Sequence, residues 1–245
     1  MPSKFRHLVK IHTSIKVQTP IQLRSKCIID YNIAITSHAR RGQIREAESL
    51  FFSMPFRNNV THTAMITAYA DNGEIHNARK LFDQIPHRST ASWNAMITAY
   101  TNTSGTINEA YSLFLEMSSR DAVSYASMIS GFIRCGHVDK AESLYSKMPH
   151  QWRHPFSSNA LMGGYLKAGR MKDAVAIFNT ITDKNVVTWS CMLDGYCKEG
   201  MIKEARKLFD EIPERNIVTW TAMIKGYMTS QSFNEGFVLF RQMLR

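Results

Sequence analysis

Metal-binding and nucleophilic chemistry would need cysteine and histidine at short, fixed spacings, and this sequence does not supply them. No two cysteines form a Cys-x-x-Cys pair, so neither a zinc ribbon nor a thioredoxin-type redox pair is indicated. No histidine has a glutamate two places on, and no glycine-rich phosphate loop or Ser/His/Asp grouping stands out. We expect the cysteines to be small buried apolar residues in a reducing compartment: Cys27, Cys135, Cys191 and Cys197.

His150 and His154 are four residues apart and flank Trp152, between two prolines. This setting predicts loop residues rather than metal ligands. The sequence therefore predicts no catalytic centre, no metal site and no cofactor, and it favours a binding protein over an enzyme.

The elements that position side chains in this chain are repeated. Small polar residues recur at intervals of 31 to 33 residues, and each could accept a hydrogen bond from an early N–H of a helix. We therefore expect them to be helix N-caps: Asp30, Thr61, Ser92, Ser124, Ser157, Thr188 and Thr219. A glycine follows about twelve residues later, where the left-handed conformation can end the helix. These glycines are Gly42, Gly73, Gly105, Gly136, Gly169 and Gly200, and Gln231 stands at the seventh place.

A second helical pattern follows each turn and places a small residue four positions before an aromatic one, on the same helix face. The small residues are Ala47, Ala78, Ala110, Ala141, Ala174, Ala205 and Gly236. The aromatic residues are Phe51, Phe82, Phe114, Tyr145, Phe178, Phe209 and Phe240. Proline helps to end this helix at Pro55, Pro86, Pro149 and Pro213. A methionine column in the first helices is expected to be core packing: Met65, Met96, Met128, Met192 and Met223.

Each unit is thus a helix, a turn and a helix, and a single hairpin cannot bury its apolar stripe alone. Stacked hairpins can, so the predicted fold class is all-α, a right-handed α-solenoid with a concave face lined by the first helices. The predicted units are 28–58, 59–89, 90–121, 122–154, 155–185, 186–216 and 217–245. No polar capping helix follows the last unit, which we expect of a truncated or fragmentary product.

Two families build helical hairpins near this length. Tetratricopeptide repeats need a small residue five places after the expected cap, but bulky residues such as Ile35, Ile66 and Ile224 stand there. The wording "VTWSCMLDGYCKEGMIKEARKLFDEIPERN" instead resembles pentatricopeptide repeats, in the short 31-residue form of plant organelle proteins. The resemblance covers residues 28 to 245.

The resemblance implies sequence-specific binding of single-stranded RNA, with one base per repeat. In that family the residue before the expected cap packs against the base plane, which here gives Ile29, Val60, Ala91, Val123, Phe156, Val187 and Val218. Two further residues of each unit read the base. The implied pairs are Asn32 with Asn58, Thr63 with Ser89, Asn94 with Asp121, Ala126 with His154, Asn159 with Asn185, and Ser190 with Asn216, while Thr221 lacks a partner.

The second member of each pair also has a physical reading. An ionised aspartate only accepts hydrogen bonds and suits uracil or guanine, whereas asparagine can donate to cytosine or adenine. In the family, asparagine as first member goes with pyrimidines, and threonine or serine with purines. Together these imply 5′-(C/U)-n-U-n-(C/U)-A-3′, with the second base leaning to purine through Thr63 and the fourth read poorly because Ala126 offers no hydrogen bond.

The N-terminus carries most of the net charge of +10, because residues 1 to 29 contain six basic side chains and no acidic ones. Apolar residues from Phe5 to Ile15 share one helical face there. This profile predicts a transit peptide within residues 1–27, mitochondrial rather than chloroplast because serine is scarce. The alternative is a disordered basic arm that contacts RNA directly. No apolar run approaches the roughly 20 residues needed to span a bilayer.

Many proteins with this repeat form direct C-to-U editing of organelle RNA through a C-terminal zinc deaminase domain, whose motifs are absent here. We therefore expect an RNA-recognition adaptor for an editing or processing enzyme supplied in trans. The alternatives are a factor that acts on RNA stability, splicing or translation by occupancy alone, and a protein–protein scaffold. No membrane or small-molecule substrate is expected.

Overall fold

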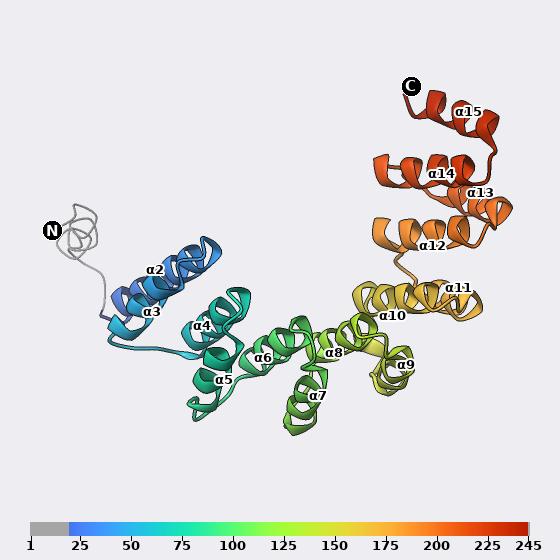
Figure 1. The fold of residues 1–245 in the computed structure, drawn as a ribbon. Helices are drawn as coiled ribbons and strands as arrows, with labels where there is room; N and C mark the ends of the chain where they lie inside the picture. The colour runs from blue at the N-terminus through green and yellow to red at the C-terminus, as the bar shows by residue number, and fades with distance from the viewer. Residues whose placement is uncertain (1–19, 245) are drawn as a thin grey trace. The chain divides into compact units, whose positions relative to one another are not determined.

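The computed structural model describes residues 20–244, and within that range every regular element is a helix (Figure 1). The first helices of the hairpins are α2 (Pro20–Arg40), α4 (Asn59–Asp71), α6 (Thr90–Asn102), α8 (Ala122–Arg134), α10 (Pro155–Lys167), α12 (Val186–Lys198) and α14 (Ile217–Thr229). The second helices are α3 (Ile44–Ser53), α5 (Ile75–Asp83), α7 (Ile107–Glu116), α9 (Val138–Lys147), α11 (Met171–Thr180), α13 (Ile202–Glu211) and α15 (Phe233–Met243). A short 3₁₀ helix, η1 (His150–Trp152), follows α9.

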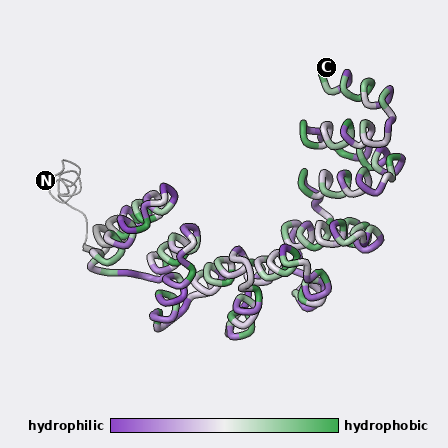
Figure 2. The backbone as a smooth tube through the Cα atoms, viewed as in Figure 1, coloured by the Kyte–Doolittle hydropathy of each residue, from purple (hydrophilic) through white to green (hydrophobic). Residues whose placement is uncertain are grey.

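The helices form two compact parts, one up to Ala99 and one from Tyr100. Within the first part, α2 packs on α3 and α4, and α4 packs on α5. Within the second part, each first helix packs on its own second helix and on the next first helix, so that α10, α12 and α14 lie side by side (Figure 1). Apolar and polar residues alternate along the helices in both parts (Figure 2). This stacking of hairpins in chain order confirms the predicted all-α solenoid class.

The turn inside each hairpin takes the left-handed conformation that the glycine column predicts. All six column glycines have φ between 70° and 83°. Gln231, which stands in the seventh turn, also has a positive φ of 61°. A residue with a Cβ atom is strained in this region of backbone space, so the seventh turn keeps its geometry at some cost in stability.

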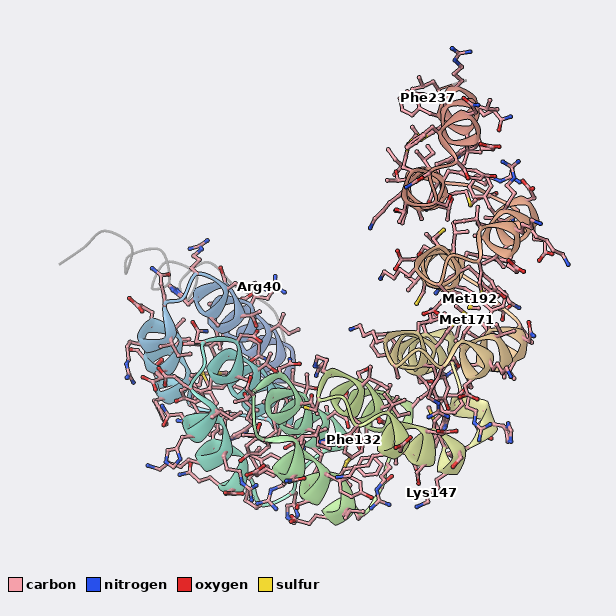
Figure 3. All side chains as sticks on the ribbon, turned by 45° about the vertical axis from the view of Figure 1, so that its right-hand side comes forward. Arg40, Phe132, Lys147, Met171, Met192 and Phe237 are labelled. Atoms are coloured by element: carbon pink, nitrogen blue, oxygen red, sulfur yellow. The ribbon has the colours of Figure 1, made fainter. Side chains whose placement is uncertain are left out.

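The predicted packing columns form the core. The six column alanines are fully buried, and the aromatic residues from Phe51 to Phe209 are at most 7% exposed. The seventh aromatic, Phe240, is 43% exposed because no helix of the described residues follows it. The methionine column is fully buried, including Met192, labelled in Figure 3. It therefore serves as core packing, as predicted.

The predicted N-caps are wrong by three residues. Asn58, Asp121, Asn185 and Asn216 begin α4, α8, α12 and α14, and their side chains accept from the backbone N–H of the third helical residue. The column expected to cap is that third residue, and it is buried. Its hydroxyl instead reaches back toward the cap, as when Thr219 Oγ1 accepts from the N–H of Asn216 at 3.1 Å. Asp30, the first member of the column, lies inside α2, so the expected boundary at residue 28 also falls within that helix.

A basic residue just before each of six caps closes the preceding second helix. Arg215 shows the arrangement: Nε donates to Phe209 O at 3.1 Å, Nη2 donates to Asp210 O at 3.0 Å, and the guanidinium lies 4.9 Å from the Phe209 ring centroid. These side chains add donors to carbonyls at the end of the helix, where the regular intrahelical pattern of hydrogen bonds stops. We call this set the basic clamps: Arg57, Arg88, Arg120, Arg153, Lys184 and Arg215.

The cysteine prediction holds for part of the set. Cys197 is buried and Cys191 half-buried, and burial raises the pKa of both thiols, that of Cys197 to about 11. Cys135 is exposed, which contradicts its expected burial, because it caps α8 at the solvent-facing turn. Cys27, the basic amphipathic stretch and all of the expected transit peptide lie outside the described side chains. None of the described helices is both long enough and apolar enough to cross a membrane.

Candidate nucleic-acid interface

The residues predicted to pack against bases form an exposed row along the first helices. Each of them is the second residue of its helix in α4, α6, α8, α10, α12 and α14. The large members are between 50% exposed (Val218) and 68% exposed (Phe156), and Ala91 is exposed as well. Within each part the row is Ile29, Val60 and Ala91, then Val123, Phe156, Val187 and Val218. Apolar side chains held in solvent at every repeat favour a planar apolar partner.

The last residue of each repeat is also the helix cap, and this second duty orients its side chain. Asn185 Oδ1 accepts from Thr188 N and Thr188 Oγ1, both at 3.0 Å. Asn216 Oδ1 accepts from the backbone of Val218 and Thr219 at 3.1 Å. Because the oxygen is engaged with the helix, the Nδ2 amide group is the part of each asparagine that remains to donate.

The same logic applies to the other caps. Asn58 Oδ1 accepts from Thr61 N at 2.9 Å, Ser89 Oγ from Ser92 N at 3.2 Å, and Asp121 Oδ1 from Ser124 N at 2.8 Å. Asp121 carries acceptors alone and therefore presents no donor to a ligand. His154 differs, because its side chain makes no bond to α10, the helix that it caps.

The first members of the reading pairs lie one helical turn further in. Asn32, Thr63, Asn159 and Ser190 are half-buried, Asn94 and Ala126 are buried, and Thr221 is exposed. The hydroxyls of this column donate to their own helices, Thr63 to Asn59 O at 2.7 Å and Thr221 to Ile217 O at 2.6 Å. Their oxygen lone pairs are then the groups left to accept a hydrogen bond.

One predicted pair is joined directly. Asn159 Nδ2 donates to Asn185 Oδ1 at 3.4 Å, across 26 residues of sequence and between consecutive first helices. The side-chain oxygens of Asn32 and Asn159 are buried and have no hydrogen-bond partner in the protein. A buried acceptor without a partner costs free energy, about 1–3 kcal/mol. Asn94 lies in the part that ends at Ala99, and Asp121 lies in the part that begins at Tyr100.

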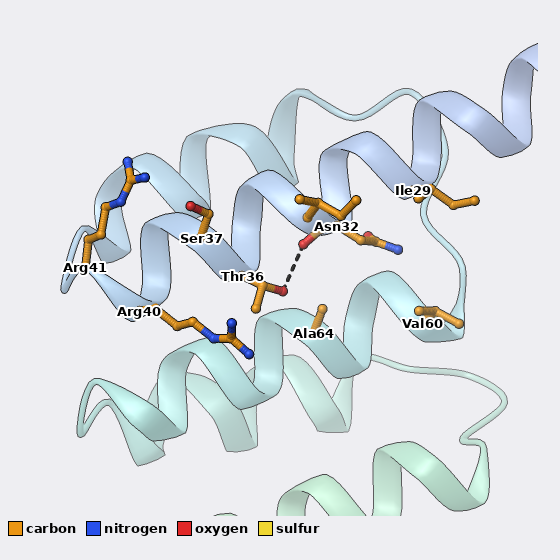
Figure 4. Close-up of a pocket in the computed structure, with 9 residues that line it drawn as sticks. Ile29, Asn32, Thr36, Ser37, Arg40, Arg41, Val60 and Ala64 are labelled. Carbon is orange, nitrogen blue, oxygen red and sulfur yellow. Dashed lines mark hydrogen bonds between the residues drawn. The ribbon is translucent and has the colours of Figure 1, made fainter.

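A groove between α2 and α4 brings together two kinds of predicted residue, the base-packing residues and a first reading residue (Figure 4). Ile29 and Val60 lie at one end and Asn32 lies beside them, and the groove has a volume of about 750 Å³. Thr36, Ser37 and Ala64 line its middle, where Thr36 Oγ1 donates to Asn32 O at 2.9 Å. An apolar pair with a buried amide between two helices suits a flat heterocycle that also forms hydrogen bonds.

The far end of the groove holds Arg40 and Arg41, which the sequence prediction did not include (Figure 4). Both are exposed, and Arg40 is the last residue of α2. A signal for them exists in the sequence, because Arg134, Lys167 and Lys198 end α8, α10 and α12. A cation at the end of a first helix is placed to meet an anionic backbone that crosses the groove.

No group of three or more histidine, cysteine, aspartate or glutamate side chains that could hold a metal ion occurs among the described residues. His150 belongs to η1 and lies 3.3 Å from Arg153 through its Nδ1, while His154 caps α10. The expected loop is therefore partly a 3₁₀ turn.

Comparison with known proteins agrees with this architecture. The chain is 28% identical over 126 residues to pentatricopeptide repeat-containing protein At4g21065 of Arabidopsis thaliana, covering 36% of this chain and 21% of that protein. It is 30% identical over 92 residues to At3g49170, chloroplastic, covering 35% of this chain and 11% of that protein. The chain thus spans about a fifth or less of these curated relatives.

Solved structures extend the likeness to nearly the whole chain. The maize pentatricopeptide repeat protein PPR10 superposes with a TM-score of 0.70 and 16% identity, covering 98% of this chain and 36% of that one. A structure of PPR10 in complex with an 18-nt psaJ RNA element gives a TM-score of 0.71 at 20% identity, covering 98% of this chain and 37% of that one. These likenesses support the solenoid fold.

Family models described as the PPR repeat match seven segments of the sequence. The segments are residues 29–58, 60–89, 91–121, 123–151, 156–186, 183–213 and 218–245. Because these matches cover most of its length, the chain belongs to the pentatricopeptide repeat family.

Proposed function

We propose that this chain binds single-stranded RNA along the face of its first helices, with one base in each slot between consecutive first helices of the same part. The observation that carries the proposal is the exposed apolar row, which stands beside caps whose remaining groups are oriented by the helices themselves. A base can lie flat against two members of the row while its edge meets the cap and the first reading residue.

The groove between α2 and α4 supports this geometry. Ile29 and Val60 flank the position of the base plane, and Asn32 lines the same groove. An amide carries both a donor and an acceptor, so Asn32 can bond the edge of a pyrimidine. The RNA-binding PPR10 structure, in which a relative of this fold holds an RNA element, agrees with such a role.

The orientation of the caps supports the predicted order of bases. A donating asparagine amide at Asn185 and Asn216 suits cytosine N3 or adenine N1, and an accepting carboxylate at Asp121 suits uracil N3–H. The predicted sequence therefore stays 5′-(C/U)-n-U-n-(C/U)-A-3′. Each mismatch at a read position should cost about 1–3 kcal/mol.

We further propose a role in organelle RNA metabolism, as an adaptor that positions an editing or processing enzyme supplied in trans. Family membership supports this role, and the relatives that match the chain include proteins designated chloroplastic and mitochondrial. The basic, acid-free N-terminus favours the mitochondrion. Binding without a catalytic partner, in RNA stability, splicing or translation, is the second candidate, and it uses the same face.

Fluorescence anisotropy with the predicted hexamer and a permuted hexamer of the same composition tests the proposal. We expect at least a tenfold preference for the predicted order, because permutation mismatches more than one read base. Equal affinity for both would contradict base reading. If neither RNA binds, the RNA function fails and a protein scaffold remains.

A charge variant tests how the RNA backbone is held. Arg40→Gln should weaken binding to all sequences alike and reduce the slope of log K against log salt by about 0.7, the value of one phosphate contact on a single strand. Lys172→Gln removes one exposed charge from α11, a second helix, and is the matched control. Identical slopes for Arg40→Gln and the control would remove Arg40 from the binding face.

A further inference from the structure

The fourth repeat departs from the others at its end, where His150 to Pro155 add two residues. The fold absorbs this insertion as η1, whose Trp152 ring lies 5.9 Å from the Tyr125 ring of α8. Arg153 keeps the clamp by donating from Nε to Met148 O at 3.2 Å. As a result, Phe156 still stands as the second residue of α10, in register with the exposed apolar row.

Neither predicted reading residue of this slot presents a polar group that the helix orients. Ala126, the first reading residue, presents only a methyl group and is 8% exposed. His154 caps α10 without a side-chain bond to that helix, which starts with Pro155 and its missing N–H. Its imidazole is therefore not oriented by capping, and its two tautomers offer a donor or an acceptor at either nitrogen. Such a group can satisfy any base edge.

The stacking group of this slot is the strongest in the row. Phe156 is the one aromatic member of the row, and at 68% it is also the most exposed. Every base has a π-face, so stacking on an aromatic ring holds a base without regard to its identity. The equivalent position in the neighbouring repeats is occupied by Val123 and Val187, which have no π-face.

We propose that the slot between α8 and α10 is a base-indifferent stacking site, in which Phe156 anchors the fourth RNA base and no side chain selects its identity. The inference rests on the proposed RNA-binding function and assigns different roles to different repeats. Repeats with asparagine or aspartate caps read bases, and the fourth repeat holds the strand between them.

The experiment uses the full chain and a set of hexamers that differ in the fourth base alone, together with one that is abasic there. Wild-type affinity should vary by less than about fivefold among the four bases, which is below a mismatch of 1 kcal/mol. Phe156→Val, which restores the valine of the neighbouring repeats, should weaken all four by a similar factor of about 5 to 150. The same variant should change binding of the abasic RNA less. Phe237→Val, at an exposed phenylalanine of α15 (Figure 3), is the matched control and should bind as wild type does.

A second series varies the third base, for which the accepting carboxylate of Asp121 predicts uracil. A preference for uracil there, with no preference at the fourth base and a loss with Phe156→Val, supports the stacking site. Selectivity above tenfold at the fourth base, or wild-type affinity of Phe156→Val, overturns it while the proposed function stands. If the third base is also unselected, base reading itself has failed and the stacking site fails with it.

Discussion

Asn185→Asp should change which base the fifth repeat binds and leave the fold intact. The asparagine caps α12 through Oδ1, which accepts from Thr188 N and Thr188 Oγ1 at 3.0 Å each. A carboxylate oxygen accepts the same two bonds, and the bond from Asn159 Nδ2 at 3.4 Å also survives. The change is confined to the other terminal atom, where the Nδ2 donor becomes an oxygen acceptor.

The two consequences have different magnitudes. Asparagine and aspartate are nearly equal as N-caps, and a negative charge at a helix N-terminus contributes about 0.3–1 kcal/mol, so stability should stay the same or rise slightly. One base-edge hydrogen bond is reversed in direction, which is worth about 1–3 kcal/mol of discrimination, or about 5- to 150-fold. The fifth base, predicted to be cytosine or uracil, should therefore shift toward uracil through a loss of affinity for cytosine.

Anisotropy titrations with two RNAs that differ in the fifth base measure the switch, and thermal unfolding followed by circular dichroism measures stability. Asn185→Ala is the reference that loses both functions, and it should cost about 1 kcal/mol of stability. Asn216→Asp is the positional control, because it should switch the sixth base from adenine to guanine and leave the fifth unchanged. An unchanged order of affinities in Asn185→Asp would refute the reasoning that the cap directs the base contact.

Three further outcomes follow from the fold. Gln231→Gly should raise the free energy of unfolding by about 1 kcal/mol, measured by urea titration, because it relieves a positive φ of 61°; a loss of stability would show that the turn is not strained. Arg215→Ala should lower stability by about 1–3 kcal/mol in the same assay, since it removes two bonds to helix carbonyls and a contact with the Phe209 ring; no loss would exclude a stabilising role for the clamp. Iodoacetamide at pH 8 should modify Cys135 within minutes and leave Cys197 unmodified until the protein unfolds, because burial raises the pKa of Cys197 to about 11; mass spectrometry of the peptides reads the order, and equal rates would contradict the burial.

The packing of the repeats was predictable because small and aromatic columns at a fixed spacing leave few arrangements. Ala205 and Phe209 illustrate this, since their spacing of four places both on one face and both are buried. The position of the caps was harder to predict. Asn216 and Thr219 can each accept from a helix N–H, and only the structure shows that Asn216 is the cap and that Thr219 supports it.

The positions of the candidate site residues along the repeats were predictable from the sequence. The orientation of their side chains was not. The exposed row lies at the expected residues because six of the seven first helices begin one residue before the row residue. The orientation of Asn185 and Asn216 was not predictable, since it follows from hydrogen bonds to the following turn. The basic clamps were not predictable for a similar reason, because their partners are backbone carbonyls that carry no sequence signal.

If the caps also read bases, as we propose, this has a consequence for how such an array can evolve. Few residue types serve well as a helix N-cap, mainly asparagine, aspartate, serine and threonine. Asn58, Ser89, Asp121, Asn185 and Asn216 are all of these types. Substitutions among these residue types can change the preferred RNA sequence while the protein stays folded. Substitutions by other residue types weaken the helix N-terminus and are first selected against as folding defects. His154 is the exception, and it stands at the repeat where we propose that no choice of base is made.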